Sequence, residues 1–136
     1  MSPRFLGLDE VLTIHRDQVA RYGGTLGLRD LGLLESALAM PGAGFGGQYL
    51  HEDLFAMAAA YLYHLVPNHP FVDGNQRSGA VAAIVFLALN GIELDADEES
   101  FEATVRAVAE GKLGRAAVAA FFRQHADRPG RPGPAP

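Results

Sequence analysis

The stretch HPFVDGNQRSG, from His69 to Gly79, concentrates polar groups between two apolar segments of the sequence. A neutral imidazole near pH 7 can take the proton of a hydroxyl group, and a carboxylate can bind Mg²⁺ through oxygen. These properties make His69 a candidate general base and Asp73 a candidate metal ligand. An amide and a guanidinium fork suit phosphate oxygens and the charge that develops during phosphoryl transfer, so Asn75 and Arg77 are candidate phosphate ligands.

The backbone of this stretch is also suited to a binding site. Pro67 and Pro70 exclude helix on both sides of His69, and Phe71 offers an apolar anchor, so we expect the histidine to be held in place. Gly74 removes side-chain bulk where the next helix begins, and free N–H groups at a helix N-terminus bind anions. The sequence therefore predicts a phosphate site that includes Gly74.

The residues of this stretch resemble the signature of the Fic/Doc family, with histidine, phenylalanine, an acidic residue, a small residue, asparagine and arginine in this order. RYGG (Arg21–Gly24) and GLRDLGLLESAL (Gly27–Leu38) are similar to the N-terminal part of death-on-curing (Doc) toxins, and the resemblance covers about residues 5–125. It implies the Fic fold, a Phd-like antitoxin partner and a role in bacterial growth arrest. It also places the family's catalytic histidine on His69 and its metal-binding acid on Asp73.

Two positions depart from the pattern of the AMP-transferring members. These members usually have glycine and a second arginine where this chain has Gln76 and Ala80. Doc proteins also replace the glycine, typically with lysine, and bind ATP turned so that its terminal phosphate is exposed. The resemblance thus implies a kinase that uses ATP and Mg²⁺ to phosphorylate a serine or threonine hydroxyl of elongation factor Tu and so arrests translation. AMP transfer to a protein hydroxyl, and a non-catalytic module that binds nucleotide or a partner, remain alternatives.

Helical periodicity predicts the elements that position this stretch, as a compact all-α bundle of about six helices. The predicted helices are Asp9–Tyr22, a segment capped by Asp30 and stopped by Pro41, His51–Val66, Asn75–Asn90, Phe101–Glu110 and Arg115–His125. The glycine-dense Pro41–Gln48 predicts a mobile loop or a short hairpin. In Fic-type proteins a flap in this region aligns the target polypeptide, so Phe45 and Tyr49 are candidates for target docking.

Composition limits the class of protein. The chain has 136 residues, 49% of them hydrophobic, which fits one domain over residues 1–126, followed by a flexible Pro/Gly-rich tail over residues 127–136. The absence of cysteine excludes a cysteine nucleophile, and a net charge of −5 argues against direct binding of nucleic acid. The longest apolar stretch, Ala80–Leu89, is too short to span a membrane, and the N-terminus lacks the features of a signal peptide, so a cytoplasmic location is expected. Four further histidines lack a paired metal-binding spacing, and we interpret them as structural or solvent-facing, with no zinc site: His15, His51, His64 and His125.

Overall fold

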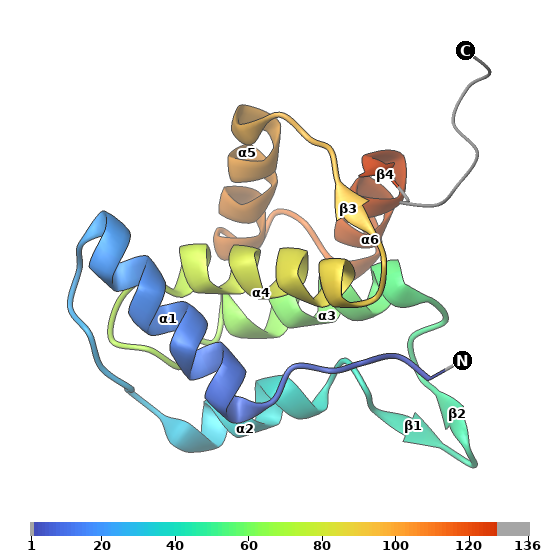
Figure 1. The fold of residues 1–136 in the computed structure, drawn as a ribbon, viewed down its shortest axis with the longest axis horizontal. Coiled ribbons are helices and arrows are strands. Elements are labelled where there is room, and N and C mark those ends of the chain that lie inside the picture. The colour runs from blue at the N-terminus through green and yellow to red at the C-terminus, as the bar shows by residue number, and fades with distance from the viewer. Residues whose placement is uncertain (1, 128–136) are drawn as a thin grey trace.

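Within residues 2–127, which the computed structural model describes, the chain forms six α-helices and four strands of two residues each (Figure 1). The helices are α1 (Leu8–Tyr22), α2 (Leu31–Ala39), α3 (Leu54–Leu65), α4 (Asn75–Leu89), α5 (Glu98–Ala109) and α6 (Arg115–Gln124). This architecture confirms the predicted all-helical bundle.

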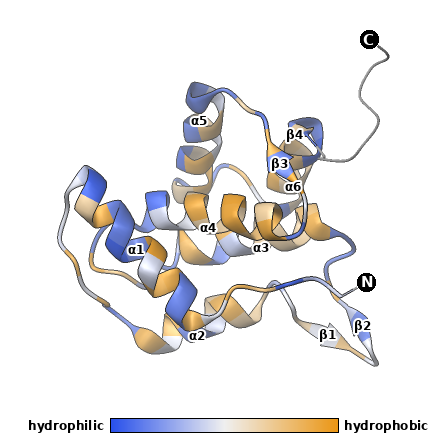
Figure 2. Ribbon diagram, viewed as in Figure 1, coloured by the Kyte–Doolittle hydropathy of each residue, from blue (hydrophilic) through white to orange (hydrophobic). Residues whose placement is uncertain are grey.

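Helix α3 forms the centre of the bundle, and the hydropathy of the chain explains why (Figure 2). Eight of its 12 residues are buried, and α2, α4 and α6 pack around it. Burial of one large apolar side chain contributes about 1.5 to 3 kcal/mol, so the large buried side chains of this helix make a substantial contribution to the stability of the core. Helix α4 approaches α3 closely at Gly79, where an added Cβ would lie 2.6 Å from Val66 Cγ2. In the described part of the chain, no helix is both long and apolar enough to cross a membrane.

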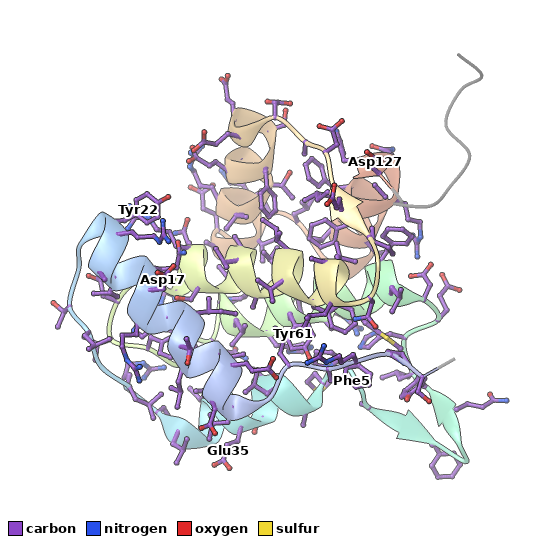
Figure 3. The ribbon with its side chains drawn as sticks, in the orientation of Figure 1. Phe5, Asp17, Tyr22, Glu35, Tyr61 and Asp127 are labelled. Atoms are coloured by element: carbon purple, nitrogen blue, oxygen red, sulfur yellow. The ribbon has the colours of Figure 1, made fainter. Side chains whose placement is uncertain are left out.

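The segment before α1 closes one side of the core. Figure 3 shows Phe5 and Tyr61 near the middle of the bundle, where the ring of Phe5 stacks on Phe86 at a centroid distance of 5.8 Å. The backbone N–H of Leu6 donates to the Tyr61 hydroxyl oxygen at 2.8 Å. Burial raises the pKa of Tyr61 to about 12, which keeps its hydroxyl neutral in the fold.

The short strands form two antiparallel pairs. Strands β1 (Gly44–Phe45) and β2 (Gln48–Tyr49) make a hairpin in the glycine-dense segment. Of the two predicted alternatives, a mobile loop or a short hairpin, the chain thus forms the hairpin. Strands β3 (Glu93–Leu94) and β4 (Ala126–Asp127) were not predicted, because two residues are too few to show the alternation of a strand. The predicted tail thus loses its first residue to β4, and residues 128–136 lie outside the described residues.

The helix caps were predicted only in part. Asp30 caps α2 as expected, because its carboxylate accepts from the N–H of Leu33 at 3.0 Å. Helix α1 begins at Leu8, one residue earlier than predicted, after the N-cap Gly7, whose N–H donates to the Glu10 side chain. Helix α3 begins three residues later than predicted, since Asp53 accepts from the N–H of Ala56 and fixes the start.

Candidate active site

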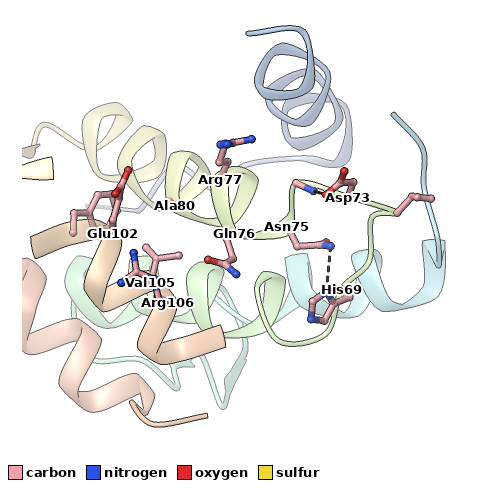
Figure 4. A pocket seen from close by; sticks show the side chains of 12 residues that line it. His69, Asp73, Asn75, Gln76, Arg77, Ala80, Glu102, Val105 and Arg106 are labelled. Carbon is pink, nitrogen blue, oxygen red and sulfur yellow. Dashed lines mark hydrogen bonds between the residues drawn. The ribbon is translucent and has the colours of Figure 1, made fainter. Parts of the chain in front are cut away.

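The loop between α3 and α4, here called the His69 loop (residues 67–74), opens onto a cleft of about 450 Å³ (Figure 4). Helix α5 forms the opposite wall. The cleft is lined by His69, Val72, Asp73, Gly74, Asn75, Gln76, Arg77 and Ala80 from the loop and α4, and by Phe101, Glu102, Val105 and Arg106 from α5. The five residues predicted as catalytic, metal-binding or phosphate-binding all border this cleft.

His69 adopts an unusual backbone conformation, with φ at +50°. The left-handed region costs a non-glycine residue about 1 to 2 kcal/mol, and the following Pro70 restricts it further. Such a conformation persists only where neighbouring groups hold it. The Arg29 guanidinium stabilises it, because Nε donates to the His69 carbonyl and Nη2 donates to the Asn68 carbonyl at 2.9 Å. His69 nevertheless remains an exposed residue.

The Asn75 side chain binds the backbone of the His69 loop. Its Oδ1 accepts from the N–H of Phe71 at 3.0 Å, and its Nδ2 donates to the Phe71 carbonyl at 3.0 Å. The same Nδ2 lies 3.4 Å from His69 Nδ1, a long contact marked by the dashed line in Figure 4. The Asn75 amide is therefore engaged on the backbone of Phe71, and a phosphate contact at Nδ2 would compete with that bond.

Asp73 carries an ionised carboxylate beside the start of α4. Its Oδ2 accepts from the N–H of Thr25 at 3.1 Å and its Oδ1 from the N–H of Gly74 at 2.8 Å. These backbone hydrogen bonds hold the pKa of Asp73 below its usual range, with a smaller contribution from the nearby Arg77. The described residues contain no cluster of three or more metal-binding side chains. A lone carboxylate suits Mg²⁺, which is commonly bound by one or two carboxylates together with substrate phosphates.

The two glycines after α1 make room for this carboxylate. Gly24 has φ at +109°, and a Cβ there would lie 2.8 Å from Asp73 Oδ2. A Cβ added at Gly23, where φ is +84°, would have no atom within 4 Å. Glycine is therefore required at position 24 both for its backbone conformation and to leave space for the Asp73 carboxylate, which gives the Gly-Gly pair of the RYGG motif a role at the site.

The N-terminus of α4 is free of side-chain caps. Its N-cap is Gly74, in the left-handed region at φ +74°, and no side chain bonds the first turn. Neither Asp73 nor Asn75 therefore caps this helix. The N–H groups of the first helical turn lack intrahelical acceptors, and together with the helix dipole they are suited to binding an anion.

Gln76 and Arg77 leave α4 on different sides. The Arg77 guanidinium lies 5.0 Å from the centroid of the Tyr22 ring, so it points toward α1 and away from His69 (Figure 4). The Gln76 side chain points toward α5. The site thus holds its predicted cation at the rim, where a ligand would have to draw it from Tyr22.

Two further parts of the site were missed by the sequence analysis. Helix α5 contributes the apolar Val105 and the cation of Arg106, and within residues 2–127 no acidic side chain pairs with Arg106. Only the packing of α5 near α4 brings this wall to the cleft.

His15 of α1 is buried with its ring parallel to that of Phe71, at a centroid distance of 3.8 Å, and its Nδ1 lies 3.0 Å from Ser78 Oγ. Burial lowers the pKa of His15, so this histidine supports the anchor of the loop in its neutral form.

The hairpin residues predicted to dock a target are not brought to the cleft. Phe45 is 93% exposed and Tyr49 packs edge-on against Phe5 at 5.8 Å. The hairpin precedes α3 and the His69 loop follows it, and Figure 1 places them at opposite ends of that helix. Twelve helical residues span about 18 Å, so a docking role for Phe45 and Tyr49 requires a target that reaches along α3.

Comparison with known proteins shows similarity over most of the chain. Residues 5–87, which contain the Gly-Gly pair, the hairpin and the His69 loop, match the sequence model of the Fic/DOC family. The chain is 43% identical over 93 residues to Toxin Doc of Mycolicibacterium smegmatis, covering 68% of this chain and 69% of that protein. It is 31% identical over 121 residues to Protein kinase doc of Escherichia phage P1, covering 89% and 94% respectively.

Proposed function

Because this chain belongs to the Fic/DOC family, we propose that it is the toxin of a toxin–antitoxin pair and a protein kinase. Its substrates are ATP, used with Mg²⁺, and a serine or threonine hydroxyl of elongation factor Tu. The observation that carries the proposal is the arrangement of three groups in one cleft: a held but exposed His69, the ionised Asp73, and the uncapped N-terminus of α4. This set supplies a base, a metal ligand and an anion site.

The transfer follows from these positions. The His69 imidazole takes the proton of the target hydroxyl, and the hydroxyl oxygen forms a bond to the terminal phosphorus of ATP. The bond from that phosphorus to the bridging oxygen breaks, and ADP leaves. The N–H groups of Asn75, Gln76 and Arg77, at the first turn of α4, stabilise the negative charge on the transferring group. Asp73, which borders the cleft, would hold Mg²⁺, and the ion would neutralise charge on the phosphate oxygens.

Phosphate transfer is favoured over AMP transfer by Gln76. This side chain occupies the cleft next to the anion site and points toward α5, so it narrows the space into which the rest of a nucleotide must extend. The name of the phage P1 relative, Protein kinase doc, agrees with this choice. AMP transfer is the second candidate, because the family's AMP-transferring members act through the same histidine.

A toxin of this kind needs an inhibitor. The relative named Toxin Doc supports a partner antitoxin, which we propose to be Phd-like. We further propose that residues 1–126 form the whole Fic/Doc domain and that it acts in the cytoplasm, where ATP and the elongation factor are found.

The test is intact-mass analysis of elongation factor Tu after incubation with this protein, ATP and Mg²⁺. We expect a gain of one phosphate with the wild type and none with His69→Ala. His125→Ala, which alters a histidine at the end of α6 outside the cleft, is the matched control and should behave as the wild type. A gain of one AMP would replace the kinase by the second candidate. No gain with any variant would refute enzymatic modification of this target.

A further inference from the structure

The segment between α1 and α2, here called the strap (residues 23–30), lies along the outer side of the His69 loop. The N–H groups of Arg29 and Asp30 both donate to the Pro70 carbonyl, at 2.8 and 3.0 Å. The N–H of Val72 donates to the Gly27 carbonyl at 2.9 Å, and Leu28 forms an antiparallel bridge with Phe71. The strap thus fixes the loop on the C-terminal side of His69 through the backbone alone.

A side chain of the strap does the same on the N-terminal side. The Arg29 guanidinium donates through Nε to the His69 carbonyl and through Nη2 to the Asn68 carbonyl. These two donors lie on one edge of a rigid planar fork, so the two carbonyls must point the same way to meet them. An extended backbone points successive carbonyls in opposite directions, and the turn at His69, with φ at +50°, brings them together.

The proline after the histidine makes this support necessary. A residue before proline prefers an extended backbone with negative φ, and His69 departs from that preference. Within residues 2–127, Arg29 forms no ion pair with an acidic side chain. Its only side-chain hydrogen bonds there are the two to carbonyls of the His69 loop. Its charge therefore strengthens both bonds and has no competing partner.

From these contacts we infer that Arg29 is a positioning residue for His69: its guanidinium holds the backbone turn that aims the imidazole into the cleft. The inference rests on the proposed function for its kinetic consequence only. Its conformational consequence, that the His69 ring changes environment when Arg29 is removed, holds whether or not the protein is a kinase.

Three variants test this role. Arg29→Ala removes both bonds to the carbonyls, and Arg29→Lys keeps a cation that can reach one carbonyl but cannot bridge both as a fork. Arg16→Ala is the matched control, because Arg16 is an exposed arginine on α1 with no side-chain hydrogen bond or ion pair in the described part of the chain. All are made in the full-length protein, and thermal unfolding checks that each is folded.

The first readout is the imidazole NMR signals of protein labelled with ¹⁵N-histidine, with His69→Ala used to assign the His69 resonances. We expect the His69 signals to shift or broaden in Arg29→Ala, to lie between in Arg29→Lys, and to stay in place in Arg16→Ala. The signals of buried His15, which packs on Phe71, should not move, because the strap's backbone bonds remain. Unmoved His69 signals in folded Arg29→Ala would overturn the inference.

The second readout is kinetic. A misplaced base lowers kcat by about 10- to 100-fold while KM for ATP stays within about 2-fold, since Arg29 lies outside the cleft that takes the nucleotide. Arg29→Lys should recover part of kcat and Arg16→Ala all of it. A wild type that transfers no phosphate refutes the proposed function and leaves the NMR result to decide on Arg29. A wild type that is active beside an equally active Arg29→Ala refutes the positioning role alone. If Arg29→Ala fails to fold, Arg29→Lys carries both readouts.

Discussion

Gly24→Ala is the substitution that most directly tests the geometry of the site. The new Cβ would lie 2.8 Å from Asp73 Oδ2, roughly 0.6 Å closer than the shortest ordinary van der Waals contact. The carboxylate is the far end of a short side chain and can rotate away, but doing so breaks its bond from the Thr25 N–H. We expect Asp73 to leave its position, and its pKa to rise toward the usual range as that hydrogen bond is lost.

Gly23→Ala is a control of the same type. Both glycines have positive φ, at +84° and +109°, so either alanine should cost about 1 to 3 kcal/mol of stability through backbone strain. At Gly23, however, the added Cβ would meet no atom within 4 Å. Backbone strain should therefore cost the two variants similar stability, while only Gly24→Ala disturbs Asp73.

The assay compares phosphate transfer by the two variants over a range of Mg²⁺ concentrations, with denaturant unfolding measured in parallel. For Gly24→Ala we expect the Mg²⁺ concentration for half-maximal rate to rise and kcat to fall by about 10- to 100-fold. For Gly23→Ala both should stay within about 2-fold of the wild type. Equal rates and equal Mg²⁺ dependence in the two variants would refute the claim that Gly24 exists to accommodate the Asp73 carboxylate.

Three other predictions concern the nucleotide, the core and pH. Gln76→Gly should shift the product on the target from phosphate toward AMP, whereas Gln76→Lys should retain phosphate transfer; intact mass distinguishes the two, and AMP transfer by the lysine variant would contradict the steric argument. Gly79→Ala places a Cβ 2.6 Å from Val66 Cγ2 and should lower the free energy of unfolding by about 1 to 3 kcal/mol, as denaturant titration would show. The pKa of Tyr61 is raised from 10.0 to about 12, so its contribution to stability is complete below pH 10 and is lost as the pH rises through 12. Tyr61→Phe should lack this loss of about 2 to 3 kcal/mol. If the free energy of unfolding falls equally in both proteins between pH 10 and 12, the loss does not come from Tyr61.

The sequence predicted the helices more accurately than it predicted the site. Periodicity and capping residues are local signals, so Asp30 and the helix after it were placed correctly. The start of α3 was placed too early because three polar residues, His51, Glu52 and Asp53, precede its apolar run, and the sequence does not show that Asp53 is the one that caps the helix. The β3–β4 pair depends on residues more than 30 positions apart, and two-residue strands leave no periodic trace.

The types of the site residues could be predicted, but several of their contacts could not. Arg77 has the chemistry of a phosphate ligand, yet its position over Tyr22 depends on where α1 packs. Asn75 has the chemistry of a ligand as well, yet its amide is used on the backbone of Phe71. The α5 wall with Arg106 carries no motif and reaches the cleft only through the packing of helices.

These contacts explain why a loop of eight residues cannot form the site alone. A histidine before proline would relax to an extended backbone, and Asp73 would lose its bond from Thr25, if the strap were absent. The loop is held by a segment about 40 residues earlier in the chain, through Arg29 on one side of His69 and backbone bonds on the other. The histidine and aspartate supply the chemistry, whereas RYGG and the strap supply the geometry. Substitutions that break these contacts, at Gly24 and at Arg29, should therefore lower kcat by misplacing Asp73 and His69 respectively, although no strap residue borders the cleft.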